Sequence, residues 1–323
     1  MSAIATRPRL GFAGVGWIGR HRLAAIAASG AAEVAAVADP AGVELDVECL
    51  PSFDELLQRD LDGIVIATPS ALHAEQAIAA LERGVAVFCQ KPLGRTGSET
   101  LAVVESARLA DRLLGVDFSY RRTDGARALR EEVRSGALGE IYAVDLVFHN
   151  AYGPDKPWFY DRRLAGGGCL IDLGSHLADL ALWVLDFPAA SVRSARLLSP
   201  HGLDVEELAL AELDLGGATV RLACSWRLPA GRDCVIEASF YGTDGGASLR
   251  NVDGSFYDLR ADRHRGTESE QLAGPGDDWG GRAAVEWARQ LAAGARHDAE
   301  IEHVVSVAQL LDAIYREGRC ESS

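Results

Sequence analysis

The sequence lacks the features that mark nucleic-acid-binding and membrane-spanning proteins. It carries 32 basic against 47 acidic residues, a net charge of −15, and only two of the basic residues are lysines, Lys91 and Lys156. Nucleic acids and anionic membranes are bound largely by clustered Lys and Arg, so this balance argues against both as partners. No apolar run reaches the roughly 20 residues of a membrane-spanning helix. The most apolar stretch, 169–184, is interrupted by three ionisable side chains.

Paired cysteines and a secretory leader are also missing. The six cysteines are scattered, with no C-x-x-C pair and no zinc-binding spacing. The opening segment, 1–12, has no long apolar stretch followed by a small-residue cleavage site. Scattered thiols in a chain of this size indicate a reducing compartment, so we expect a cytoplasmic location.

What the chain does have is the length and composition of a two-domain protein. Its 323 residues, 48% of them apolar, exceed what a single small core needs. In residues 1–120 short apolar runs alternate with segments of helical periodicity, which implies right-handed crossovers and a parallel sheet covered on both faces. We therefore predict a doubly wound α/β domain there. The expected strands are 9–16, 33–39, 61–68, 85–90 and 113–119, with helices that include 17–29 and a segment capped by Ser70 and ending near 83.

The remainder, 121–323, has a different pattern. Short alternating segments separated by Gly, Pro and Asp turns indicate a mostly antiparallel sheet. The polar, Gly-rich region 261–281 is expected to be a surface loop, and the last two helices are expected to pack back near the first domain. The expected strands are 140–150, 191–198, 205–215, 217–227, 233–241 and 246–250, and the expected helices are 125–135, 170–185, 280–294 and 302–317.

Gly14, Gly16 and Gly19 have the G-x-G-x-x-G spacing of a dinucleotide-binding turn, with Trp17 and Ile18 between the last two. The motif follows an expected strand and opens an expected helix, which is the context that this fingerprint requires. There the first glycine makes a tight turn, the second lets the backbone approach a pyrophosphate, and the third permits close helix–strand packing. The helix N-terminus offers free amides to the phosphates. We predict a dinucleotide site; a plain glycine-rich turn is the alternative.

Asp39 ends the second expected strand, 20 residues after Gly19. A carboxylate at this position can accept hydrogen bonds from the adenosine ribose hydroxyls and would repel a 2′-phosphate, which favours NAD over NADP. Arg20 and His21, in the first turn of the helix, could help to bind an extra phosphate, so NADP is the alternative cofactor. A solvated Asp at a strand end is the alternative reading of Asp39.

Lys91 ends the fourth expected strand, and ligands bind at the carboxyl ends of strands in sheets of this kind. Pro92 confines Lys91 to extended backbone, which fixes the direction of its ammonium group. Its retention in a chain with one other lysine points to a role, although a surface lysine is the alternative.

Asp172 and His176 are four residues apart on an expected helix, so their side chains share one face. A histidine there can take a hydroxyl proton while a hydride leaves the same carbon, and the carboxylate can orient it. The glycine run 166–168 permits close approach of a ligand. A histidine on an apolar helix can also be a packing residue. The Asp–His spacing could suggest a metal, but no third ligand is evident, and we expect none.

Four segments together resemble the glucose–fructose oxidoreductase/inositol dehydrogenase (Gfo/Idh/MocA) family: 14–19, 67–73, 89–93 and 166–176. The resemblance covers nearly the whole chain. It implies an N-terminal nicotinamide-binding Rossmann domain and a C-terminal α/β domain whose large open sheet forms a homodimer or homotetramer interface. The implied reaction is reversible oxidation of a secondary alcohol on a sugar, inositol or related polyol.

By this resemblance, Lys91 polarises the substrate oxygen, His176 is the general acid/base and Asp172 supports or orients the site. Two departures from the family pattern are visible. Gln90 stands where the family usually has Glu, which removes a negative charge beside Lys91. The stretch 40–51 lacks a full helix, which leaves the adenine side of the cofactor site more open. The other cofactor-binding positions that the resemblance implies are Thr68, Pro69, His73 and Gln90.

The substrate pocket is predicted from residues that follow the last strand of the first domain, end the first strand of the second, or precede the glycine run. Aromatic rings beside polar groups suit a sugar, whose CH faces stack while its hydroxyls form hydrogen bonds. Two or three of these residues are expected to line the pocket. They are Tyr120, Arg121, Arg122, His149, Asn150, Trp158, Phe159, Tyr160 and Asp161.

The leading hypothesis is an NAD(P)-dependent dehydrogenase or ketosugar reductase. It requires Lys91 from the first domain and His176 from the second to meet over the nicotinamide. One alternative is a non-catalytic dinucleotide sensor or scaffold. Another is an enzyme that oxidises a sugar transiently to enable elimination or glycoside cleavage.

Overall fold

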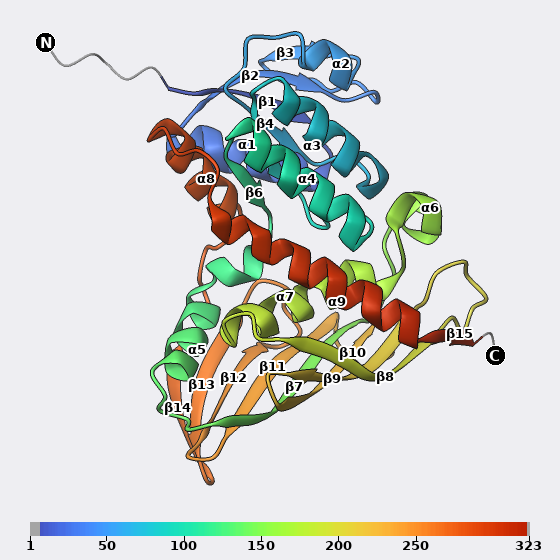
Figure 1. The fold of residues 1–323 in the computed structure, drawn as a ribbon, viewed down its shortest axis with the longest axis vertical. Helices are drawn as coiled ribbons and strands as arrows, with labels where there is room; N and C mark the ends of the chain where they lie inside the picture. The colour runs from blue at the N-terminus through green and yellow to red at the C-terminus, as the bar shows by residue number, and fades with distance from the viewer. Residues whose placement is uncertain (1–6, 322–323) are drawn as a thin grey trace, which may run out of the picture. The chain divides into compact units, whose positions relative to one another are not determined.

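The structure, a computed structural model, describes residues 7–321 and consists of two compact units (Figure 1). The first unit contains the chain up to 94 together with 98–119 and 280–305, and the second contains 95–97, 120–279 and the chain from 306 onward. Residues 1–6, part of the segment inspected for a secretory leader, lie outside the described residues. Within the described part, no helix has the length and apolar character needed to cross a membrane.

The first unit is built on a six-stranded parallel sheet with the strand order β3-β2-β1-β4-β5-β6. The four residues of β4 and those of β5 are all buried, as expected for strands covered on both faces. The strand order reverses beside β1, and ligands of doubly wound sheets bind at this switch point. The predicted doubly wound domain is thus confirmed. The strands are β1 (Arg9–Ala13), β2 (Glu33–Ala38), β3 (Glu48–Leu50), β4 (Gly63–Ile66), β5 (Ala86–Cys89) and β6 (Leu114–Val116).

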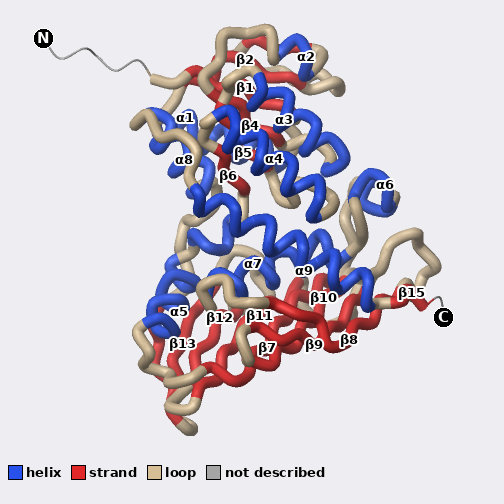
Figure 2. Tube along the Cα trace, in the orientation of Figure 1, coloured by secondary structure: helices blue, strands red, loops and turns tan. Residues whose placement is uncertain are grey.

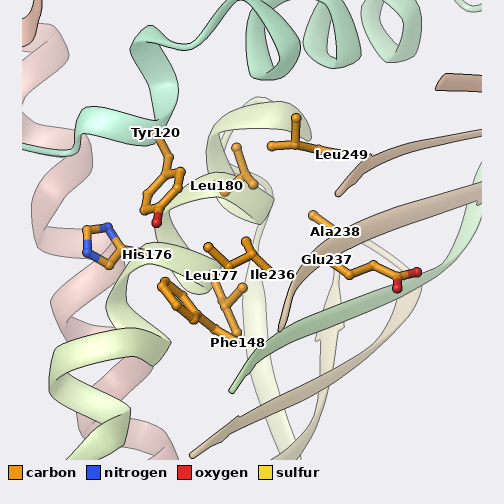
Figure 3. Close-up of a pocket in the computed structure, with 9 residues that line it drawn as sticks. All are labelled: Tyr120, Phe148, His176, Leu177, Leu180, Ile236, Glu237, Ala238 and Leu249. Atoms are coloured by element: carbon orange, nitrogen blue, oxygen red, sulfur yellow. The ribbon is translucent and has the colours of Figure 1, made fainter. Parts of the chain in front are cut away.

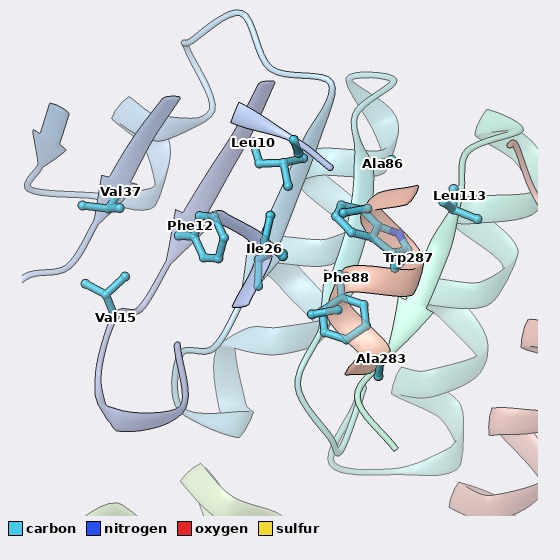
Figure 4. Packing of buried hydrophobic residues seen from close by; sticks show 14 residues of the cluster. Leu10, Phe12, Val15, Ile26, Val37, Ala86, Phe88, Leu113, Ala283 and Trp287 are labelled. Carbon is cyan, nitrogen blue, oxygen red and sulfur yellow. The ribbon is translucent and has the colours of Figure 1, made fainter. Parts of the chain in front are cut away.

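A helix from near the end of the chain completes the core of this unit. Trp287 packs against Phe88, with ring centroids 5.7 Å apart, beside Leu10 and Ile26 (Figure 4). The buried Trp and Phe rings supply much of the apolar area that holds this helix on the sheet. The helices of the unit are α1 (Trp17–Ser29), α2 (Phe53–Leu56), α3 (His73–Glu82), α4 (Gly97–Ala110) and α8 (Arg282–Ala292).

The second unit is built on a nine-stranded sheet with the order β14-β13-β12-β11-β7-β10-β9-β8-β15. Among the described strands of this sheet, only the β7–β10 and β8–β15 pairs are parallel, so the predicted mostly antiparallel sheet is confirmed. Its strands are β7 (Ile141–Asn150), β8 (Ala190–Leu198), β9 (Leu208–Leu215), β10 (Ala218–Ser225), β11 (Cys234–Gly242), β12 (Gly246–Asn251), β13 (Leu259–Arg265), β14 (Glu268–Ala273) and β15 (Arg319–Glu321).

Helices of the second unit cover one face of its sheet (Figure 2). Val144, Leu146 and Phe148 of β7 are buried on that face and alternate with residues that are less buried. The unit contains α5 (Asp124–Arg134), α6 (Arg162–Ala165), a π-helical turn (Leu170–Gly174) that continues into α7 (Ser175–Val184), and most of α9 (His303–Glu317). Of these, α5, the π-helical turn and α7 make the main contacts with the sheet. Short 3-10 turns occupy Ser70–Leu72, Ser119–Arg122, Pro157–Tyr160 and Ala299–Glu302.

Two predictions from the sequence are wrong. The region 261–281 is not simply a surface loop, because most of its first half forms the β13–β14 hairpin. Its polar side chains pair across the two strands, as Arg263 and Glu270 do at 2.6 Å. The polar composition of this region therefore reflects the exposed edge of the sheet. Ser70 is the first residue of a 3-10 turn that leads into α3, and its side chain does not cap the helix.

Candidate functional site

The glycine-rich turn follows β1 at the switch point of the first sheet. Gly14 has a φ of +80°, and a Cβ there would lie 2.6 Å from the carbonyl oxygen of Ala67. A Cβ on Gly19 would lie 2.1 Å from the carbonyl oxygen of Gly14, so the helix can approach the turn only with glycine at this position. A Cβ on Gly16 would have no neighbour within 4 Å among the described atoms. The turn therefore combines two crowded glycines with an open one, which fits a backbone that a pyrophosphate approaches.

Asp39 follows β2 beside this turn. Its Oδ2 accepts a hydrogen bond of 2.9 Å from the amide of Val15, and its Oδ1 accepts one of 3.0 Å from the amide of Ala41. Each carboxylate oxygen has a further lone pair that a ribose hydroxyl can use. Arg20 donates to the carbonyl of Val15 at 2.9 Å, which ties it to the same turn, while Trp17 is 69% exposed.

The residues after β4 are held by a buried histidine. The ring of His73 is 1% exposed, and its two nitrogens lie 2.7 Å from the carbonyl oxygens of Thr68 and Pro92. Burial lowers the pKa of His73, opposed by these two carbonyls and reinforced by the charge of Lys91. The hydroxyl of Thr68 donates to Gln76 at 2.7 Å. His73 thus ties the end of β4 to the end of β5, where Lys91 lies.

Gln90, just before Lys91, belongs to a buried polar network that the sequence did not reveal. Its amide donates to Oδ2 of Asp117, whose carboxylate is 1% exposed. Asp117 also forms an ion pair with Arg22 at 2.5 Å and accepts from the hydroxyl of Ser119 at 2.8 Å. Gln fits here because its amide can donate to Asp117, whereas an ionised Glu would face it with like charge.

In the second unit, Asp172 lies in the π-helical turn and His176 in the first turn of α7. Both side chains are half-buried, while the residues between them are buried, so the two share the accessible side of this segment. Such single π turns are frequent at functional sites. The expected helix 170–185 is present, with a wider first turn than the sequence indicated.

Trp226, which directly follows β10, was missed by sequence reasoning. Its indole nitrogen donates to Oδ2 of Asp172 at 3.1 Å, and its ring meets Tyr160 edge-on at 5.6 Å between centroids. Trp226 is 3% exposed, so this donor is fixed by packing. No motif marked it, because the partner lies 54 residues away in the sequence.

The ring of His176 is enclosed on one side by aromatic residues. It meets Tyr120 edge-on with centroids 4.9 Å apart, and Phe148 lies at 6.2 Å (Figure 3). The cavity behind these rings measures only about 10 Å³, so it holds no ligand larger than a single water. Burial raises the pKa of Tyr120 well above its ordinary value, so its hydroxyl stays neutral at physiological pH.

The remaining substrate candidates are dispersed. Alternation along β7 directs His149 to the sheet face opposite Phe148, and its Nδ1 lies 2.8 Å from the hydroxyl of Ser225. Burial lowers the pKa of His149. Arg121 forms an ion pair with the buried Asp179. Of the nine candidates, Tyr120 contacts His176, and Tyr160 and Phe159 contact Trp226.

Three candidates in the loop before the glycine run take part in local structure. Trp158 stacks on Phe159 with ring centroids 3.8 Å apart. Asp161 caps α6 by accepting from the amide of Arg163, and the side chain of Arg163 lowers the pKa of Asp161. Among the described residues, no hydrogen-bond donor meets Oδ1 of Asn150. The described residues also contain no His, Cys, Asp or Glu cluster that could hold a metal ion.

Comparison with known proteins agrees with this architecture. Residues 9–118 match a family model described as an oxidoreductase family with an NAD-binding Rossmann fold, and residues 126–248 match the GFO/IDH/MocA C-terminal domain. The chain is 31% identical over 302 residues to D-xylose 1-dehydrogenase (NADP(+)) 2 of Haloferax volcanii, covering 91% of this chain and 89% of that protein. It is 30% identical over 211 residues to D-glucoside 3-dehydrogenase of Escherichia coli strain K12, covering 60% of each.

Solved structures share the fold. A 3-ketoreductase from Actinomadura kijaniata, crystallised with NADP and TDP-benzene, superimposes with a TM-score of 0.86 at 23% identity, covering 98% of this chain and all of that one. Levoglucosan dehydrogenase in complex with NADH gives a TM-score of 0.82 at 23% identity, covering 97% of each chain.

Fold and family models together define a protein with an NAD-binding Rossmann domain and a C-terminal domain on an open sheet. The chain belongs to the Gfo/Idh/MocA family. The alignment spans 60% of the length of D-glucoside 3-dehydrogenase and 54% of the length of levoglucosan dehydrogenase from Pseudarthrobacter phenanthrenivorans.

Proposed function

We propose that this protein is an NAD(P)-dependent oxidoreductase that interconverts a secondary alcohol and a ketone on a sugar, inositol or related polyol. The observation that carries the proposal is the pair Asp172 and His176 on the accessible side of one helical segment, in a chain whose other unit is an NAD-binding Rossmann fold. Relatives named D-glucoside 3-dehydrogenase, inositol 2-dehydrogenase and D-xylose 1-dehydrogenase support the substrate class.

The cofactor is held in this proposal by the first unit. The amides at the start of α1 would bind the phosphates, Gly16 would leave room for them, and Asp39 would accept hydrogen bonds from the ribose. When bound, the nicotinamide accepts or supplies the hydride. The carboxylate of Asp39 favours NAD, since a 2′-phosphate would meet like charge; Arg20 is the nearby cation that would help NADP.

The chain's own residues handle the proton and the substrate oxygen. Lys91 polarises that oxygen with its ammonium group, and His176 takes the hydroxyl proton in oxidation or returns it in reduction. Asp172, fixed by the indole of Trp226, supports this site. Tyr160, which contacts Trp226, is the aromatic residue best supported as a sugar contact.

The assay mixes the protein with NAD⁺ or NADP⁺ and myo-inositol, D-xylose, D-glucose or levoglucosan, and in reverse with reduced cofactor and 1,5-anhydro-D-fructose. Reduced-nicotinamide absorbance is expected to change with at least one substrate, faster with NAD(H). Tight cofactor binding without turnover in either direction would contradict the proposal and favour a sensor. Consumption of a glycoside without net change in reduced cofactor would indicate elimination chemistry.

We also propose that the protein is cytoplasmic and self-associates through the uncovered face of the second sheet. The five cysteines whose side chains are described are all free, which supports a reducing compartment. The uncovered face carries Leu210 (40% exposed) and a shallow hollow of about 680 Å³ that also includes Arg221 and Asp145. Light scattering should give a dimer or tetramer, and Leu210→Glu should shift it toward the monomer; a monomeric wild-type protein would overturn the idea.

A further inference from the structure

The glycine run, 166–168, packs closely against the segment that precedes β9. The amide of Cys169 donates to the carbonyl of Glu206 at 2.9 Å. A Cβ on Gly168 would lie 2.0 Å from that carbonyl oxygen, and a Cβ on Gly167 would lie 1.9 Å from the hydroxyl of Tyr315. Glycine is therefore needed at both positions to let Glu206 and Tyr315 reach the turn.

The side chain of Glu206 meets the start of this turn directly. It is 0% exposed, and its Oε1 accepts from the amide of Gly168 at 2.8 Å, the amide of Leu170 at 3.1 Å and the hydroxyl of Tyr315 at 2.7 Å. Cys169, the N-cap of the turn, makes no side-chain cap of its own. Glu206, from a distant segment, thus accepts the backbone hydrogen bonds that an N-cap side chain usually accepts.

The other oxygen of Glu206 has a different environment. Oε2 has no hydrogen-bond partner among the described residues, and its nearest cation is Arg162, at 3.7 Å. Burying a carboxylate is costly, and an apolar side chain of similar size would avoid that cost while leaving two buried amides without an acceptor. Oε1 accepts these hydrogen bonds whether or not Oε2 carries a proton. The turn therefore needs an oxygen acceptor at this position and does not need a charge.

We propose that Glu206 is a positioning residue for the reaction, holding the π-helical turn so that Asp172 and His176 keep their places. The proposal rests on the proposed function of these two residues. Leu170, whose amide Glu206 binds, lies two residues before Asp172, and α7 continues the same helical segment. Tyr315, on α9, donates a hydrogen bond to Glu206 and therefore affects the turn only through Glu206.

The neighbouring residue Glu207 provides a matched control. It is also buried, at 2% exposed, but its carboxylate binds Nδ1 of His201 at 2.9 Å and Arg227 at 3.3 Å. Within the described part of the chain, its carboxylate makes no hydrogen bond or ion pair with the glycine run. Substitution of either residue removes a buried acidic side chain from the same stretch of chain, and only substitution of Glu206 removes the acceptor of the turn.

The test measures hydrogen–deuterium exchange of peptides covering 166–176 in the full chain for Glu206→Ala, Glu206→Gln, Tyr315→Phe and Glu207→Ala. Exchange of this segment should rise strongly in Glu206→Ala, slightly in Tyr315→Phe, and stay at the wild-type rate in Glu207→Ala. Glu206→Gln keeps an oxygen at the Oε1 position and should protect the segment as the wild type does. If Glu206→Ala does not fold, Tyr315→Phe still decides the outcome, because unchanged exchange of 166–176 in that variant would contradict the proposal.

Kinetics supply the second readout, with the polyol that gives turnover in the assay above. Glu206→Ala should lower kcat on the order of 100-fold, because a displacement of about 1 Å at the reacting groups costs that much. The NADH affinity, read from fluorescence quenching, should be unchanged, and Glu206→Gln should restore most of kcat.

Three results would overturn the proposal: unchanged exchange of 166–176 in Glu206→Ala, a Glu206→Gln protein as impaired as Glu206→Ala, or equal loosening in Glu207→Ala. The exchange measurement needs no turnover. If the wild-type protein shows no activity, the proposed function fails, and the exchange result alone still decides whether Glu206 holds the turn.

Discussion

In the first unit, the glycine-rich turn combines close backbone packing with one side-chain hydrogen bond, whereas in the second unit Asp172 and the turn that carries it are held by hydrogen bonds from the side chains of distant segments. Gly19 sits against the carbonyl of Gly14, and Asp39 binds the amide of Val15. Asp172 instead depends on Trp226, and its turn depends on Glu206. Substitutions at these positions should therefore fail differently: Gly19→Ala through steric clash, and changes at Trp226 or Glu206 through lost hydrogen bonds.

The largest effect is expected when either proposed reacting side chain is removed. Lys91→Ala and His176→Ala should each lower kcat about 1000-fold, because each removes a group that acts only as the bond changes. NADH affinity should stay close to that of the wild type. Lys156→Ala is the control, since Lys156 is exposed and paired only with Asp155 in the described structure. Equal kcat in Lys91→Ala and Lys156→Ala would refute the role of Lys91.

Gly19→Ala and Gly16→Ala separate folding from cofactor binding in the first unit. A Cβ on Gly19 would collide with backbone, so Gly19→Ala should lower the free energy of unfolding by about 3 kcal/mol. A Cβ on Gly16 meets nothing within 4 Å, so Gly16→Ala should keep its stability and lose NADH affinity. Urea denaturation and fluorescence titration give the two quantities. If Gly16→Ala bound NADH normally, the turn would not be the pyrophosphate site.

Gln90→Glu tests the buried network of the first unit. The new carboxylate would face Asp117, and the hydrogen bond donated by the Gln90 amide would be lost. The free energy of unfolding at pH 7 should therefore fall by about 2 kcal/mol. Because a protonated Glu can donate, the loss should shrink as the pH falls toward 5. Urea denaturation at both pH values measures it. A variant as stable as the wild type at pH 7 would show that Gln90 is not needed as a donor.

Trp226→Phe tests the second unit with a smaller change. Phenylalanine keeps a ring beside Tyr160 and removes only the donor to Asp172, so kcat/KM should fall about fivefold to tenfold. The melting temperature and NADH affinity should hardly change. A loss of stability with normal kcat/KM would mean that Trp226 serves packing alone.

The smallest expected effect is the contribution of His73 to the pH dependence of stability. Burial lowers its pKa below the ordinary 6.5, so the unfolded chain binds the proton more readily than the folded protein does. This contribution to stability is present above pH 6.5 and is lost as the pH falls toward the lowered pKa. Denaturation of the wild type and His73→Gln across this range should give a flatter pH dependence in the variant; an equally steep one would contradict the assignment.

The sequence predicted the elements better than it predicted the contacts. Residues 17–29 form a helix as expected, because apolar periodicity and the glycine turn are local signals. The β13–β14 hairpin, 259–273, was missed because most of its residues are polar and the edge strand β14 has no apolar alternation. Trp226 and Glu206 were missed because each acts across more than 30 residues of chain, and Glu206 lay within a predicted strand. Sequence motifs indicate local chemistry, but they do not indicate which distant residues form hydrogen bonds in the fold.

The central claim is that hydride moves between a polyol carbon and the nicotinamide. The most direct measurement incubates the protein with NAD⁺ and the polyol found active, deuterated at its ring carbons, and weighs the reduced cofactor by mass spectrometry. The account predicts one deuterium in the nicotinamide of every reduced molecule formed. Reduced cofactor that carries no deuterium would contradict it.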